Sequence, residues 1–141
     1  MKIAGLDHIV LRTTRLEAMI GFYCDCLGCS VERETPAATG LTQLRAGNAL
    51  IDLVQVDSEL GRIGGEAPGL SGNNLDHFCL QLEPISTAEI AAHLDQHQLE
   101  HGGFEKRYGA QGYGLSVYIR DPDGNTVELR STLPLNQQEQ I

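Results

Sequence analysis

The strongest constraint on this chain is an internal repeat. The segment Gly5–Leu11 (GLDHIVL) matches the pattern of Asn74–Leu80 (NLDHFCL), and their histidines lie 69 residues apart. A segment that recurs at this spacing in a chain of 141 residues indicates two halves built on the same plan. Each half is therefore expected to fold as one supersecondary unit that is used twice.

The order of expected elements is the same in both halves. Apolar spacing predicts a helix over 15–27 that stops at Gly28. In the second half Ser86 and Glu89 form a capping-box pattern for a helix that ends near Gln98. Three short strand candidates follow each helix: 30–34, 41–45 and 49–55, then 105–108, 115–120 and 126–131. The sequence thus predicts an α+β fold of two βαβββ modules related by pseudo-two-fold symmetry.

The domain organisation follows from this order. The first module spans 1–56 and the second spans 74–133. Between them, 57–73 is rich in glycine and is expected to be a linker or a lid without a strand. The tail over 134–141 is polar and is expected to fray.

Charge and composition restrict the partners. Ten Lys and Arg against nineteen Asp and Glu give a net charge of −9, which disfavours nucleic acid and anionic membranes. No apolar run approaches the roughly 18 residues of a membrane helix. The start of the chain lacks a secretory pattern, so a cytoplasmic location is expected. Reduced thiols are then expected at four positions, although the first three also permit a metal-thiolate site: Cys24, Cys26, Cys29 and Cys79.

Four side chains at repeat-equivalent positions are the candidate site. Asp52 and Glu128 lie 76 residues apart in apolar strand segments, and His8 and His77 occupy matching strands. Burying an ionised carboxylate costs several kcal/mol unless a partner compensates it. A divalent cation would compensate both acids and bind both imidazoles, which leaves the identity open among Ni, Zn, Mn, Co and Fe. The alternative is a hydrogen-bonded core histidine and an acid on a solvated face.

Other residues are secondary candidates. The glycine-rich stretch 109–114 either rims a cavity, with Arg107 or Tyr113 touching the substrate, or is a flexible turn. Three histidines recur every four residues, of which the first two either form a zinc pair on one helical face or belong to an exposed polar face: His93, His97 and His101, the last beyond the expected end of the helix. Three arginines near the candidate ligands are expected at the surface: Arg12, Arg120 and Arg130.

Several of these motifs together resemble the vicinal oxygen chelate superfamily, which includes glyoxalase I, fosfomycin-resistance proteins, methylmalonyl-CoA epimerases and extradiol dioxygenases. They are Leu6–Leu11, Phe22-Tyr23 with Leu27-Gly28, Leu75–His77 and Val117–Leu129. The resemblance implies curved mixed sheets that enclose a metal-lined cavity, with His8, His77 and Glu128 as ligands. It places Asp52 where glyoxalase I has Glu, a side chain longer by about 1.5 Å. Without Asp52, the set resembles the ligands of fosfomycin-resistance proteins and dioxygenases.

The resemblance also implies an activity. It predicts a glyoxalase-like, metal-dependent lyase or isomerase whose small substrate chelates the metal through adjacent oxygens, with Glu128 as the base. The alternatives are a small-molecule binding or resistance protein of the fosfomycin or bleomycin type, and a small ring-cleaving dioxygenase. A homodimer is the expected assembly.

Overall fold

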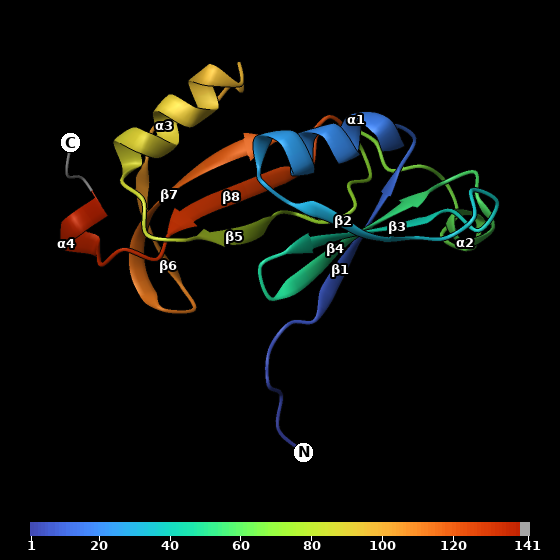
Figure 1. The fold of residues 1–141 in the computed structure, drawn as a ribbon, viewed down its shortest axis with the longest axis horizontal. Coiled ribbons are helices and arrows are strands. Elements are labelled where there is room, and N and C mark those ends of the chain that lie inside the picture. The colour runs from blue at the N-terminus through green and yellow to red at the C-terminus, as the bar shows by residue number, and fades with distance from the viewer. Residues whose placement is uncertain (139–141) are drawn as a thin grey trace. The chain divides into compact units, whose positions relative to one another are not determined.

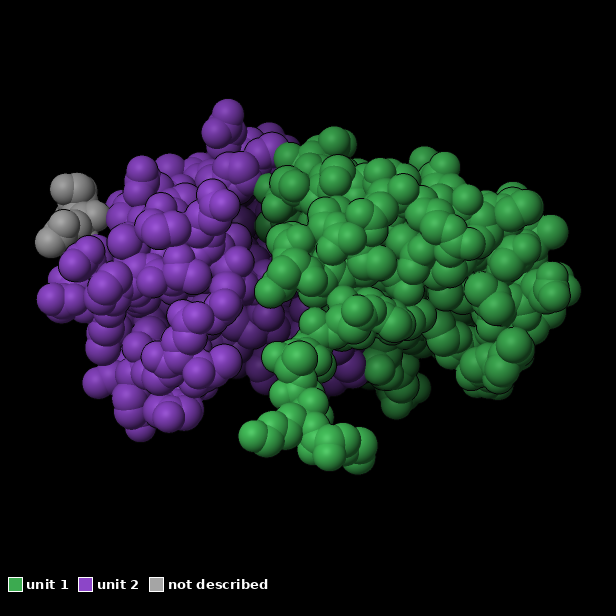
Figure 2. Space-filling view, turned by 60° about the horizontal axis from the view of Figure 1, so that its bottom comes forward, with its two compact units in different colours: residues 1–74, 122–124 green, residues 75–121, 125–141 purple. Residues whose placement is uncertain are grey.

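The computed structural model describes residues 1–138, which divide into two compact units. Unit 1 comprises residues 1–74 and 122–124, and unit 2 comprises the other described residues (Figure 2). Within the described residues, no helix is long and apolar enough to span a membrane.

Unit 1 contains a four-stranded mixed sheet in the order β1-β4-β3-β2 (Figure 1). Strand β1 is parallel to β4, and the other neighbours are antiparallel. The elements of this unit are β1 (His8–Thr13), α1 (Leu16–Gly21), η1 (Phe22–Cys26), β2 (Ser30–Glu34), β3 (Leu41–Ala46), β4 (Ala49–Gln55) and α2 (Glu59–Ile63).

Unit 2 repeats this topology in the order β5-β8-β7-β6, with β5 parallel to β8. Its elements are β5 (Phe78–Leu82), α3 (Thr87–Gln96), β6 (Glu105–Gly109), β7 (Gly112–Arg120), β8 (Thr126–Ser131) and α4 (Leu135–Gln138). Both units therefore have the βαβββ order, and the predicted α+β fold is confirmed.

Each unit has its own apolar core. In unit 1 the helical segment buries Met19, Phe22 and Tyr23 together with strand residues such as Leu11 and Leu53. In unit 2 the core consists of Ile90, Leu94, Val117, Ile119, Val127 and Leu129. Because apolar side chains fill the core from one face of each strand, the opposite face is left for polar side chains.

The first helix differs from its prediction as one α-helix over 15–27. After α1 the chain widens into the π-helical turn η1, where the Leu27 N–H donates to the Phe22 carbonyl over 3.3 Å. The wider turn allows the adjacent Phe22 and Tyr23 to be buried together, with ring centroids 5.0 Å apart in an edge-to-face pair. Core packing therefore overrides the regular helical period here.

The second helix follows its capping pattern. The Ser86 hydroxyl accepts from the Glu89 N–H over 3.2 Å, and the Glu89 carboxylate accepts from the Ser86 N–H over 2.9 Å. The predicted capping box is confirmed, and α3 ends at Gln96, two residues before the expected position.

The linker and the tail are more ordered than predicted. Helix α2 lies inside 57–73, capped by Ser58, whose hydroxyl accepts from the Gly61 N–H over 3.1 Å. In the tail, α4 buries Gln138, which accepts from the Leu115 N–H over 2.5 Å. The prediction of a frayed tail is wrong for 135–138, and its last three residues, 139–141, lie outside the described residues.

Candidate metal and substrate site

The two repeated histidines have the same local arrangement. Nδ1 of His8 lies 2.7 Å from the Asp7 carboxylate, and Nδ1 of His77 lies 2.5 Å from the Asp76 carboxylate. Each carboxylate can accept a hydrogen bond from an N–H at Nδ1, and the tautomer that donates this bond leaves a lone pair on Nε2. A carboxylate behind the imidazole is the usual arrangement for a metal-binding histidine.

In unit 2 the second ring nitrogen of His77, Nε2, faces Glu128. Nε2 of His77 lies 3.4 Å from Oε2 of Glu128, whose side chain is 8% exposed. Glu128 is held on the central strand β8, opposite Cys79 of β5 and Tyr118 of β7. The sheet register therefore brings one predicted histidine and one predicted acid together.

Unit 1 contains the equivalent pair of His8 and Asp52. Asp52 is buried on β4, opposite Val10 of β1, and its two oxygens each accept from the Gln43 amide over 3.2 Å. The Asp7 hydrogen bond raises the pKa of His8 above its ordinary value, and the negative charge of Asp52 raises it further. His8 is two residues from Val10, the β1 residue opposite Asp52, so both side chains lie on the same face of the sheet.

Tyr118 and Arg107 extend the polar face of unit 2. The Tyr118 ring makes an edge-on contact with the His77 ring, with centroids 5.5 Å apart. The Arg107 guanidinium lies over the same Tyr118 ring at 4.2 Å from its centroid. Arg107 therefore lies on the same face of the sheet as Glu128.

Tyr118 was missed at the sequence level. Its signal is the spacing across the turn 121–125, which sets Tyr118 opposite Glu128 in an antiparallel hairpin. Gln43 holds the corresponding position opposite Asp52 in unit 1 and was also missed.

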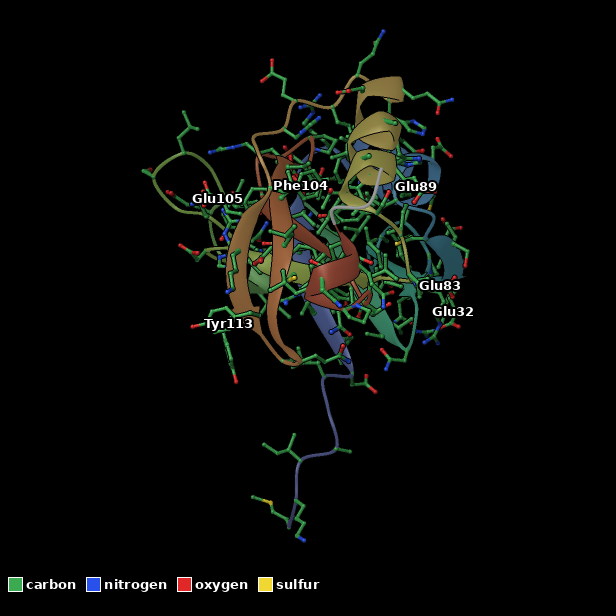
Figure 3. All side chains as sticks on the ribbon, turned by 90° about the vertical axis from the view of Figure 1, so that its left-hand side faces the viewer. Glu32, Glu83, Glu89, Phe104, Glu105 and Tyr113 are labelled. Carbon is green, nitrogen blue, oxygen red and sulfur yellow. The ribbon has the colours of Figure 1, made fainter. Side chains whose placement is uncertain are left out.

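Tyr113 and Arg130 do not occupy the places expected of them. Tyr113 alternates with Ser116 and Tyr118 along β7, lies on the opposite face of the sheet, and projects outward against Tyr108 (Figure 3). Arg130 was predicted at the surface, but it is 6% exposed, and its guanidinium donates to the Gly112 carbonyl over 2.9 Å. A Cβ atom at Gly109 would lie 1.9 Å from that guanidinium, so glycine makes room for it.

A pocket of about 760 Å³ lies beside His77 in unit 2. Its lining includes His77 and Tyr118, followed by Arg120 on β7 and His101 on the loop after α3. A small molecule bound at the His77 and Glu128 pair therefore has space beside it.

The other clusters predicted from the sequence are the cysteines and the histidines of α3. The four cysteines are free thiols, and burial raises the pKa of Cys29 to about 11, with a further contribution from Cys24. The rings of His93 and His97 lie 4.5 Å apart on α3. Among residues 1–138, no three His, Cys, Asp or Glu side chains gather closely enough to hold a metal ion.

The donor chemistry of both pairs fits a divalent cation. Each unit offers an imidazole with an aspartate carboxylate beside Nδ1, and a buried carboxylate. Each pair by itself combines one neutral donor and one negative donor. These donors suit first-row metals better than they suit Ca²⁺ or Mg²⁺, which prefer oxygen ligands only.

Curated relatives carry dioxygenase and glyoxalase names. The chain is 34% identical over 130 residues to biphenyl-2,3-diol 1,2-dioxygenase 3 of Rhodococcus globerulus, covering 89% of this chain and 62% of the relative. It is 33% identical to the glyoxalase domain-containing protein RDO1 of Mycosarcoma maydis, covering 93% of this chain and 70% of the relative. The chain thus spans about three fifths of the length of the first of these relatives.

A shorter relative and a solved structure match over nearly their full lengths. A probable lactoylglutathione lyase of Synechocystis is 27% identical, over 90% of this chain and 95% of the relative. The crystal structure of virulence protein STM3117 from Salmonella typhimurium has a TM-score of 0.74 and 28% identity, over 94% of this chain and 100% of that one. The family model described as Glyoxalase/Bleomycin resistance protein/Dioxygenase superfamily matches residues 5–129. With the repeated βαβββ units and their paired histidines and acids, this match shows that the chain belongs to the glyoxalase/bleomycin resistance/dioxygenase superfamily.

Proposed function

We propose that this chain is a divalent-metal-dependent enzyme of the lyase or isomerase type, acting on a small substrate with two adjacent oxygens. The observation that carries the proposal is the pairing of His77 Nε2 with Glu128 Oε2 at 3.4 Å, with the Asp76 carboxylate behind the ring. The same arrangement of histidine, preceding aspartate and buried acid recurs around His8. A repeat conserved between the two halves of one chain favours a shared role for the four side chains.

The ligands in this proposal are His8, Asp52, His77 and Glu128. The histidines would bind through Nε2, because Nδ1 is occupied by an aspartate in each case. Asp52 keeps lone pairs for a cation, because the Gln43 amide nitrogen engages only one lone pair on each of its oxygens. Its side chain is one methylene shorter than glutamate, so its oxygens would reach about 1.5 Å less far toward a shared cation.

The reaction requires stabilisation of negative charge and movement of one proton. A bound divalent cation would stabilise the charge that develops on the two adjacent substrate oxygens. Glu128 would take the proton from the carbon next to the carbonyl at Oε2, the atom that faces His77. Tyr118 and Arg107 would hold the substrate against β7, since both lie on the same face as Glu128.

Ring cleavage of a diol is a second candidate function. Two biphenyl-2,3-diol 1,2-dioxygenases of Rhodococcus globerulus are 34% and 30% identical to this chain, which favours a diol as the substrate class of this second candidate. A ligand set reduced to His8, His77 and Glu128 would leave more coordination positions open than a set of four.

The test compares Glu128→Gln with Glu83→Gln. Glu128 is buried beside His77, whereas Glu83 is exposed just after β5, so only the first change removes a ligand and a base. We expect Glu128→Gln to keep the fold, lose bound metal and lose turnover by about 10²- to 10⁴-fold. Glu83→Gln should behave like the unaltered protein.

The measurements are metal content by mass spectrometry and turnover of two substrates. The hemithioacetal of methylglyoxal and glutathione tests the lyase reaction, and biphenyl-2,3-diol with oxygen tests ring cleavage. Unchanged metal content and turnover in Glu128→Gln would refute the proposal. Tight binding of a small molecule by metal-free protein, without turnover, would favour a binding protein instead.

A further inference from the structure

Arg107 is immobilised although it is near the surface. Its side chain is 22% exposed, and Nη1 donates to the carbonyl and to the hydroxyl of Ser116 over 2.9 and 3.0 Å. Its guanidinium also stacks on the Tyr118 ring. A free arginine side chain has about 2 kcal/mol of rotamer entropy, and these contacts have already removed much of it in the free protein. Arg107 is thus organised in advance to bind another group.

An exposed carboxylate occupies the outer edge of this guanidinium. Oε2 of Glu105 accepts from Nη2 of Arg107 over 2.9 Å, and the Glu105 side chain is 72% exposed. Only one of the two Glu105 oxygens is engaged, whereas a guanidinium can bind both oxygens of a carboxylate. An exposed ion pair of this kind contributes little, so another carboxylate can displace Glu105.

The position of Arg107 relates it to the proposed ligands. The Tyr118 ring contacts the Arg107 guanidinium on one side and the His77 ring on another. About one aromatic ring therefore separates the guanidinium from the His77 and Glu128 pair. A substrate lying along Tyr118 could present adjacent oxygens at one end and an anionic group at the other.

We propose that Arg107 binds a carboxylate of the substrate, and that Glu105 occupies this place until the substrate displaces it. This inference rests on the proposed function and assigns its substrate class: a small molecule with two adjacent oxygens and a carboxylate about one ring away. Glu105 is then a specificity residue, because it competes for Arg107 more strongly with anionic ligands than with neutral ones.

The experiment measures binding of a matched pair of probes by calorimetry. The probes are 3,4-dihydroxybenzoate and its methyl ester, which share the diol and differ in the charge of the carboxyl group. The protein is used as the full chain, with and without added Mn²⁺. The variants are Arg107→Met, Arg107→Lys, Glu105→Gln and, as a control, Glu83→Gln. Glu83 follows β5, at the edge of the sheet opposite β6, so it lies on the other side of unit 2 from Glu105 (Figure 3).

The unaltered protein should bind the acid about 10- to 100-fold more tightly than the ester, the range for a hydrogen bond to a charged group. Arg107→Met should abolish this preference, so that the acid binds no more tightly than the ester. Arg107→Lys should keep only part of it, because an ammonium group cannot bind both carboxylate oxygens in parallel. Glu105→Gln should bind the acid up to about fivefold more tightly, with no change for the ester. Glu83→Gln should match the unaltered protein.

The first of three results separates this inference from the proposed function. Metal-dependent binding of both probes with equal affinity would overturn the carboxylate assignment and leave the metal-dependent enzyme standing. Absence of metal-dependent binding for both probes would overturn both proposals. Unchanged acid binding in Glu105→Gln, with the Arg107 preference intact, would overturn the role given to Glu105.

Discussion

Replacing Asp76 with asparagine should weaken metal binding without removing a ligand. The Asp76 carboxylate lies 2.5 Å from Nδ1 of His77, where a hydrogen bond favours the tautomer that leaves Nε2 able to bind a cation. Asparagine can offer only a neutral amide oxygen to the same nitrogen. The His77 ring then loses its charged partner, so its orientation is less well fixed and Nε2 becomes a weaker donor to a cation.

The expected magnitude follows from the exposure of Asp76. Loss of the carboxylate behind a metal-binding histidine weakens metal affinity by about 10- to 100-fold. The Asp76 side chain is 94% exposed, so water screens its charge and the effect should be near tenfold. Asp7, which is 90% exposed, has the same relation to His8. The double change should approach 100-fold, because each aspartate acts on its own ring.

The assay is competition for Zn²⁺ or Mn²⁺ against a chromogenic chelator near neutral pH. Asp95→Asn is the matched control, because it also removes a carboxylate from a histidine: Nε2 of His101 lies 3.0 Å from Asp95. Circular dichroism should show the same fold for all variants. Equal affinity in Asp76→Asn and the unaltered protein, or an equal loss in Asp95→Asn, would refute the reasoning.

Two further predictions concern stability. Ser86→Ala removes the hydroxyl that caps α3 and should lower the free energy of unfolding in urea by about 1 kcal/mol, whereas Ser71→Ala, at an exposed turn, should change it by less than about 0.5 kcal/mol. Hydrogen bonds to Gly102 and, to a lesser extent, to Asp95 raise the pKa of His101 above 6.5. The charged ring therefore stabilises the fold fully below pH 6.5, and this stabilisation is lost as the pH rises through the raised pKa. His101→Asn should therefore cost more stability at pH 5.5 than at pH 9, and an equal loss at both would contradict this assignment.

Local sequence patterns were sufficient for most of the fold. The capping box of Ser86 and Glu89 fixes the start of α3, because its hydrogen bonds join residues only three apart. The duplicated segments around His8 and His77 predict the βαβββ order of both units. The tail could not be predicted in this way. Gln138 is held by a hydrogen bond from Leu115, which is distant in the sequence, and by one to the carbonyl of Leu133, which lies outside the helices and strands.

The candidate ligands follow from the repeat, but their neighbours follow from the pairing of strands. The sequence by itself determined that His8 and His77, and Asp52 and Glu128, occupy equivalent positions, because a side-chain period of two is local information. Only the tertiary structure decided that Tyr118 contacts His77, that Tyr113 lies on the other face and that Arg130 is buried. These outcomes depend on strand register and on packing between distant segments, where a shift of one residue reverses the face that every side chain occupies.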